Sequence, residues 1–119
     1  MYLTIRQYQT EQRFIREILR QDRLSFVPAI TKASGFREYT CIDSGHGTIT
    51  SISVFEDRAA SERFDSVVKE WVKQNMGSLL PSSPYVISGV IENHTNGTPI
   101  AGLGAEHTAS STAKAIQAA

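Results

Sequence analysis

The chain has 119 residues, the size of one ordinary domain and too few for two separate cores. Hydrophobic residues make up 40% and charged residues 20%, a composition typical of globular proteins rather than of disordered or fibrous ones. Twelve basic side chains balance twelve acidic ones. Because a nucleic-acid binder normally carries a basic excess, we expect no nucleic-acid partner.

Membrane and disulfide signals are lacking in the sequence. No window approaches the roughly 20 apolar residues that span a bilayer, and the opening MYLTIR lacks the layout of a secretory signal. Cys41 is the only cysteine, so neither an intrachain disulfide nor a cysteine-based metal cage is expected. We therefore predict a cytoplasmic protein with no membrane partner, in which Cys41 is a neutral, half-buried thiol.

The first predicted elements are a strand and a helix. Residues 3–8 alternate with period two and contain β-branched and aromatic residues, which predicts a strand. Thr10 is suited to cap the following helix, whose apolar stripe recurs at helical spacing up to Phe26. Pro28 is expected to kink or interrupt this helix, and Gly35 to end it.

A β-hairpin follows the first helix. Residues 36–43 and 48–56 are rich in strand formers. Between them, Ser44-Gly45-His46-Gly47 supplies residues that tolerate positive φ, as a tight hairpin turn requires. Because the turn joins two strands and no helix N-terminus follows it, it is not a phosphate-binding loop.

A second helix and a fourth strand complete the predicted domain. Asp57 is placed as the N-cap of the helix, which carries Trp71, the only tryptophan, in an apolar stripe of period three to four. Gly77 is expected to end the helix, and residues 85–92 form the fourth strand.

The composition changes at residue 98. Residues 98–119 are rich in alanine, threonine and serine and contain no aromatic residue. Such a segment buries too little apolar area to offset the entropy lost on ordering. We therefore predict one domain over residues 1–97 and a mobile C-terminal tail over residues 98–119.

The element order βαββαβ is typical of the ferredoxin-like fold, an α+β fold in which a four-stranded antiparallel sheet carries both helices on one face. Both faces of the sheet are apolar, because Ile49 and Phe55 lie on one face of the third strand while Ile52 and Val54 lie on the other. The face without helices needs cover, and a second copy of the chain is the simplest cover. We predict a homodimer built sheet against sheet.

Several short motifs, in this order along the chain, are similar to those of a known family. They are Phe26-Val27-Pro28, Gly35-Phe36-Arg37, Asp43-Ser44-Gly45-His46-Gly47-Thr48, Ser53-Val54-Phe55-Glu56-Asp57-Arg58 and Glu70-Trp71-Val72. Over residues 2–91 the chain resembles the antibiotic-biosynthesis-monooxygenase-like (ABM-like) branch of the dimeric α/β-barrel superfamily, as a member without assigned activity. The resemblance implies a dimer with a pocket in each subunit, between the sheet and the helices.

The resemblance also suggests three functions. The first is a cofactor-independent monooxygenase with a small apolar pocket, acting on an aromatic or quinol-like metabolite whose carbanion reacts directly with oxygen. The second is a non-catalytic ligand-binding or interaction module, since no base with an obvious partner is visible. Haem binding ranks third. The haem-degrading pattern asks for an asparagine in the first strand and a histidine on the second helix, and this chain has Gln7 and no histidine there.

Four aromatic residues are the ligand-pocket candidates: Trp71, Tyr39, Phe64 and Phe14. Trp71 lies in the apolar stripe of its helix, which favours a core or pocket-wall role over catalysis. Tyr39 shares a strand face with Cys41. If that face meets the helices, the phenol could serve as a hydrogen-bond donor or proton relay; if it meets the dimer partner, Tyr39 is an interface aromatic. No catalytic residue is assigned.

No cofactor is expected, and no metal site. His46, His94 and His107 are far apart in the sequence and lack companion carboxylates at ligand spacing.

Overall fold

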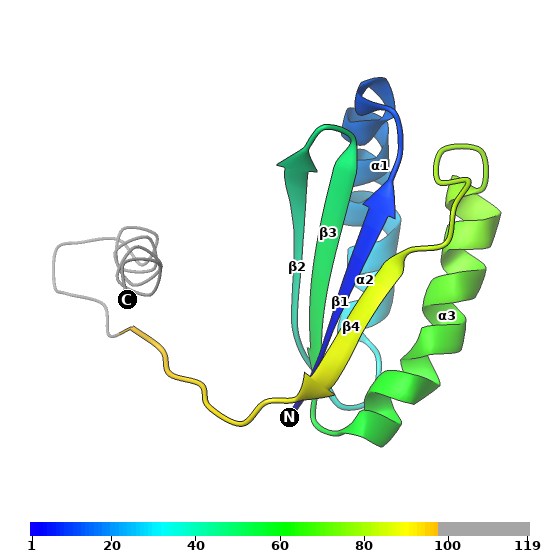
Figure 1. Cartoon of the computed structure of the whole chain (residues 1–119). Helices are drawn as coiled ribbons and strands as arrows, with labels where there is room; N and C mark the ends of the chain where they lie inside the picture. The colour runs from blue at the N-terminus through cyan, green and yellow to red at the C-terminus, as the bar shows by residue number, and fades with distance from the viewer. Residues whose placement is uncertain (98–119) are drawn as a thin grey trace, which may run out of the picture.

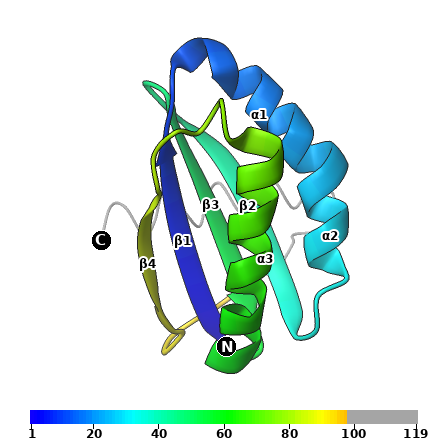
Figure 2. The same cartoon turned by 90° about the vertical axis from the view of Figure 1, so that its right-hand side faces the viewer.

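The computed structural model describes residues 1–97 of the chain as one antiparallel sheet with helices on one face (Figures 1 and 2). The four strands lie in the order β2-β3-β1-β4. They are β1 (Tyr2–Gln9), β2 (Phe36–Gly45), β3 (Thr48–Phe55) and β4 (Tyr85–Val90). The predicted α+β, ferredoxin-like fold is confirmed. The predicted tail, residues 98–119, lies outside the described residues.

Two helical units, side by side, cover the same face of the sheet. The first is a chain of four short segments, η1 (Gln12–Phe14), α1 (Ile15–Gln21), η2 (Asp22–Phe26) and α2 (Val27–Thr31). The second is the long helix α3 (Arg58–Met76). Figure 2 shows the two helical units side by side, with no helix over the edge strand β4. All six residues of β4 are correspondingly exposed.

The start of the first helix differs from the prediction. Thr10 is not its N-cap: the Thr10 hydroxyl donates to the carbonyl of Leu79 at 2.5 Å, and its backbone N–H donates to the carbonyl of Gly47 at 2.8 Å. The helix begins instead with the 3-10 turn η1, which has no side-chain cap. Thr10 therefore ties the end of β1 to the hairpin and to the segment after α3. Local capping rules cannot anticipate such tertiary bonds.

The predicted interruption at Pro28 takes the form of a π-helical turn. η2 is π-helical, and the N–H of Val27 donates to the carbonyl of Asp22, five residues earlier. Pro28 then lies in the first turn of α2, a position where proline is tolerated. The helix is thus widened rather than broken, and π turns of this kind are frequent at functional sites.

Gly35 does not end the first helix as predicted: α2 ends at Thr31, with Lys32 as its C-cap. The boundary predictions for α3 and for the hairpin turn are confirmed. Asp57 caps α3, its carboxylate accepting from the N–H of Ala60 at 2.8 Å, and Gly77 is the C-cap. In the hairpin turn, Gly45, His46 and Gly47 have φ of 87°, 53° and 76°. Gly47 also needs to be glycine for space, because a Cβ there would lie 2.1 Å from the carbonyl oxygen of Thr10.

The core consists of two apolar clusters that meet under α3. One gathers around Ile49 and Met76 and the other around Phe55 and Phe64, while Trp71 and Val72 pack against both. Ile49 and Phe55 share one face of β3 as predicted, and the structure shows that this face meets the helices, because each packs in a buried cluster with helix residues.

Candidate functional site

A cavity of about 40 Å³ lies between the sheet and the helices, where the two core clusters meet. A cavity of that size has room for about two or three water molecules. Its apolar walls include Phe26, Trp71 and Met76. The polar residues that line it are Arg6, Tyr8, Asp22, Tyr39, Cys41, Ser51 and Ser53.

Small residues in the sheet create this space. On the helix side, β3 presents Ile49, Ser51, Ser53 and Phe55 in turn, and Cys41 of β2 is the register partner of Ser51. The large residues at the two ends of the row fill the core, whereas the two serines and the cysteine leave the centre open. The cavity is therefore encoded in the inward-facing positions of β3.

Asp22 and Tyr39 form the central polar contact of the cavity. The Tyr39 hydroxyl donates to Asp22 Oδ1 at 2.5 Å, joining the π-helical turn to β2. Burial raises the pKa of Asp22 above its ordinary value, and hydrogen bonding from Tyr39 partly opposes this. Burial also raises the pKa of Tyr39, helped by the nearby Cys41 and Asp22. Tyr39 is thus a neutral donor, and Asp22 is a stronger proton acceptor than an exposed aspartate.

Tyr39 faces the helices, which decides between the two alternatives that its sequence position left open. It lies beside Asp22 and packs on Phe26 with ring centroids 5.2 Å apart, so the interface alternative does not hold in this structure.

Cys41 lies on the same side of the sheet and is a protonated thiol at neutral pH. Burial, and then the negative charge of Asp22, raise the pKa of Cys41 to about 11. The predicted neutral, half-buried thiol agrees with this environment.

Trp71 forms the helix-side wall of the cavity. Its indole Nε1–H donates to the Ser25 hydroxyl of η2 at 2.9 Å, and its ring meets Phe26 edge-on at a centroid distance of 5.1 Å. A buried indole needs an acceptor for its N–H, and here the π-helical turn supplies it. Trp71 therefore links α3 to η2 and covers the cavity.

The other two candidates lie away from the cavity. Phe64 is buried in the core between Phe26 and Phe55, with ring centroids 5.9 and 5.6 Å away. Phe14 packs at the margin of the other cluster, with the Arg13 guanidinium over its ring. Of the four aromatic candidates, the structure brings Trp71 and Tyr39 together.

Sequence reasoning missed Asp22 and the serines. Asp22 stands among the alternating charges of an amphipathic helix and has the pattern of a solvated residue; only the π turn brings it to the cavity. Ser51 and Ser53 carried a readable signal, because two small polar residues at successive inward positions of a buried strand are unusual.

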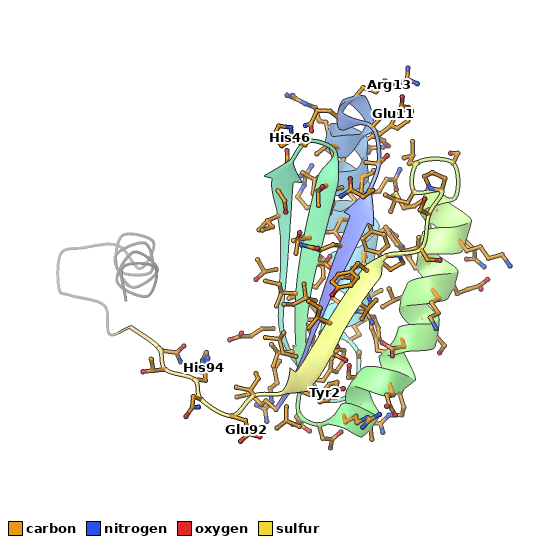
Figure 3. All side chains as sticks on the ribbon, viewed as in Figure 1. Tyr2, Glu11, Arg13, His46, Glu92 and His94 are labelled. Carbon is orange, nitrogen blue, oxygen red and sulfur yellow. The ribbon has the colours of Figure 1, made fainter. Side chains whose placement is uncertain are left out.

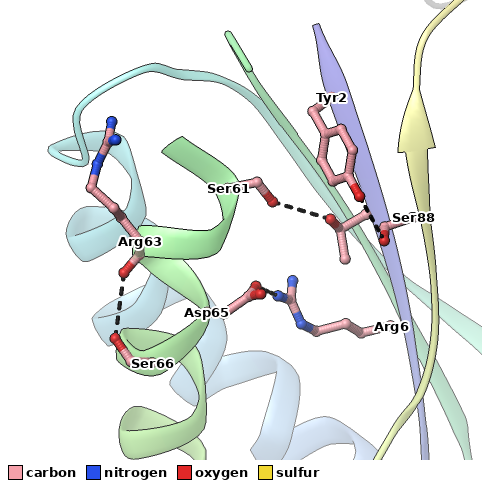
Figure 4. A network of polar contacts seen from close by, with 8 residues as sticks. Tyr2, Arg6, Ser61, Arg63, Asp65, Ser66 and Ser88 are labelled. Carbon is pink, nitrogen blue, oxygen red and sulfur yellow. Dashed lines mark hydrogen bonds and ion pairs between the residues drawn. The ribbon is translucent and has the colours of Figure 1, made fainter. Parts of the chain in front are cut away.

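Arg6 lies at the far side of the cavity and pairs with Asp65 of α3 (Figure 4). The Arg6 side chain is 11% exposed and that of Asp65 is 41% exposed. The neighbouring contact from Thr4 to Ser61, at 3.3 Å, also joins β1 to α3. These polar contacts hold α3 over β1.

The described residues contain no cluster suited to a metal ion. No group of three histidine, cysteine or carboxylate side chains gathers within residues 1–97. His46 lies at the hairpin turn and His94 beyond β4, at opposite ends of the domain (Figure 3), and His107 lies outside the described residues. No histidine lines the cavity.

Comparison with models of known protein families gives no match. Comparison with curated proteins also gives none. Solved structures do match. A monooxygenase from the gene ActVA-Orf6 of Streptomyces coelicolor, in complex with nanaomycin D, has a TM-score of 0.65 and 14% identity, covering 79% of this chain and 89% of its own.

A putative antibiotic biosynthesis monooxygenase from Nitrosomonas europaea has a TM-score of 0.65 and 8% identity, covering 78% of this chain and 100% of its own. The chain has the fold of the ABM-like proteins. The haem degrader MhuD from Mycobacterium tuberculosis, with two haems in its active site, shares that fold at a TM-score of 0.63 and 8% identity, covering 80% of this chain and 99% of its own.

The resemblance seen in the sequence motifs is thereby confirmed at the level of fold. Identities this low carry no residue roles from one protein to another. In the described part of the chain, no helix combines the length and apolarity needed to cross a membrane.

Proposed function

We propose that this protein is a cofactor-independent monooxygenase of the cytoplasm, acting on an aromatic or quinol-like metabolite. The observation that carries the proposal is the Asp22–Tyr39 pair. A half-buried carboxylate with a raised pKa, held by a phenol, opens onto a cavity walled by Phe26 and Trp71. This arrangement supplies the base that the sequence did not reveal.

In the proposed reaction, Asp22 removes a proton from an activated ring carbon of the substrate. Tyr39 holds the carboxylate in place and can donate to a substrate oxygen as charge develops on it. The carbanion adds O₂ to form a hydroperoxide, which loses water and leaves a ring carbonyl. O₂ is the oxidant: one of its atoms enters the product and the other leaves as water.

The cavity must enlarge to admit a ring, because it holds only a few water molecules as it stands. At the cavity wall, Trp71 is held by its hydrogen bond to Ser25, which joins α3 to η2. We propose that binding of the substrate breaks this hydrogen bond. The π-helical turn should move first, because its widened backbone is less regular than an α-helix.

The test is oxygen consumption with a panel of anthrones and hydroquinones. We expect turnover by the unaltered protein and a loss of about a hundredfold or more in Asp22→Asn, the scale of a missing general base. Asp43→Asn is the matched control, since Asp43 is exposed on β2 and carries the same charge. Oxygen consumption no faster than in buffer, or equal in Asp22→Asn, would overturn the proposal.

The second candidate is a non-catalytic ligand-binding module, and the small size of the cavity favours it. Phe26 and Trp71 contact each other in the cavity wall, and protein side chains leave little space inside for a ligand. A panel member that shifts the Trp71 indole N–H signal without consuming oxygen would assign this function.

Haem binding is the weakest candidate. The solved haem degrader shares the fold, but the cavity of this chain offers no histidine among its lining residues. Titration with hemin at micromolar protein is decisive: no shift of the Soret band excludes haem binding.

We propose that the open sheet face pairs with a second copy. It carries Leu3 and Ile5, and also Tyr85, Ile87 and Ile42, which are 66%, 50% and 46% exposed. Apolar residues at this density on one face are typical of an interface. Sedimentation of the purified chain should show a dimer, and Ile87→Glu should shift it to a monomer. A monomeric unaltered chain would refute the pairing.

A further inference from the structure

A groove lies on the other side of α3 from Trp71, between α3, residues 77–84 and the helix side of β1 and β4. Its volume is about 740 Å³, within the range of small-molecule sites. It exists because α3 does not reach over β4 (Figure 2). Val86 points to the helix side as the register partner of Arg6, yet it is 49% exposed.

The groove is positively charged along α3. Lys69 and Lys73 are four residues apart and line it together, and no ion pair within residues 1–97 includes either of them. Asp65, one turn earlier, is the only acidic residue of the lining, and Arg6 already pairs with it (Figure 4). Two like charges at this spacing destabilise a helix, and an anion beside them removes that cost.

Much of the remaining groove surface is apolar. Val68 and Val72 of α3, Leu80 and Pro84 of the following segment, and Val86 of β4 contribute its surface. The groove adjoins the C-terminal half of α3, where the helix dipole is negative, and no helix N-terminus in the described residues opens onto it. Such a site suits one negative charge on an apolar body better than a multiply charged phosphate.

We propose that this groove binds a small carboxylic acid with an apolar body. The carboxylate lies between Lys69 and Lys73, and the apolar body lies along Val86, Leu80 and Val72. The site shares a wall with the inner cavity, formed by Arg6, Tyr8, Val68, Val72 and Leu80, but it does not use the Asp22–Tyr39 pair. The proposal therefore stands independently of the proposed oxidation.

Binding can be measured by titrating the full-length ¹⁵N-labelled chain with decanoate, with decanol as the matched neutral probe. We expect decanoate to shift the backbone signals of Lys69, Lys73 and Val86. Decanol should bind with an affinity at least about tenfold lower, because it lacks the charge. The double variant Lys69→Gln/Lys73→Gln should lose about the same factor. Arg16→Gln/Lys32→Gln, which removes two exposed cations elsewhere, should bind as the unaltered chain does.

Equal affinity for decanol and decanoate would overturn the proposal, as would an unchanged affinity in the Lys69→Gln/Lys73→Gln variant. Shifts confined to the Trp71 indole N–H would place the ligand in the inner cavity instead and also overturn it. Groove signals that move on dilution of the protein, and not on addition of decanoate, would identify a second copy as the occupant. No shift at all with decanoate would show that the groove does not take this class of ligand.

Discussion

Replacement of Tyr39 by phenylalanine removes one hydroxyl and, with it, the hydrogen bond to Asp22. The ring stays, so its contact with Phe26 at 5.2 Å is retained and apolar burial hardly changes. A hydrogen bond to a charged group contributes about 1.5–3 kcal/mol to stability. Since Asp22 is only partly buried and water can replace part of the bond, we expect Tyr39→Phe to cost about 1–2 kcal/mol. For a domain of this size, 1.5 kcal/mol corresponds to a fall in Tm of about 6–12 °C.

The cost should depend on pH in a defined direction. The pKa of Asp22 in the folded protein is raised, so the protonated form is favoured by folding. Its contribution to stability is present below the pKa of the unfolded chain and is lost as the pH rises through the folded pKa. Removing the Tyr39 donor raises the folded pKa of Asp22 further. The difference in unfolding free energy between Tyr39→Phe and the unaltered chain should therefore be largest at neutral pH and shrink on acidification.

Urea unfolding at pH 7 and at successively lower pH, followed by circular dichroism, measures both effects. A double-mutant cycle with Asp22→Asn isolates the pair. A cost below about 0.3 kcal/mol at pH 7, within the usual error of such cycles, would contradict the reasoning. So would a cost that is the same in the Asp22→Asn background, or one that grows as the pH falls.

Three further outcomes follow from the cavity and its surroundings. Asp22→Asn should be at least as stable as the unaltered chain at neutral pH, because it removes a partly buried charge. This gain in stability should disappear below the ordinary aspartate pKa, as thermal unfolding across pH would test. Ser53→Val should raise Tm and abolish ligand-induced shifts of the Trp71 indole, because the added methyl groups fill the cavity; an unchanged titration would refute it. Arg6→Met should cost about 1–3 kcal/mol in urea unfolding, since it leaves Asp65 without its partner, and the cost should fall in an Asp65→Asn background.

The fold was predictable because its signals are local. Period-two alternation marked β1 and a run of strand-forming residues marked β3. Asp57 and Gly77 marked the ends of α3, and Gly45 and Gly47 marked the hairpin. Each signal rests on backbone conformation or capping within a few residues. The structure moved these boundaries by only a residue or two.

Thr10 shows where local reasoning fails. A threonine before a carboxylate has the pattern of an N-cap, but here its hydroxyl bonds to Leu79, 69 residues away in the chain. A tertiary hydrogen bond outweighed a local one of similar strength, and no local pattern reports such a competition.

The candidate site was predicted only in part, for the same reason. Trp71 could be proposed because it lies in the apolar stripe of its helix, and Tyr39 because a strand aromatic packs either in the core or at an interface. Asp22 could not, because its charge placed it with the solvated residues of its helix. Pro28 predicted an interruption of the helix, but not that it would be a π turn that brings Asp22 to Tyr39.

By itself, the sequence determined the order of the elements, which residues share a face of each strand, and the small residues Ser51 and Ser53 on one face of β3. These follow from backbone periodicity, which acts over a few residues. Only the tertiary structure decided that Asp22 meets Tyr39, that Trp71 bonds to Ser25, and that α3 leaves β4 uncovered beside Lys69 and Lys73. These contacts join segments far apart in the chain, and their geometry depends on how whole elements pack.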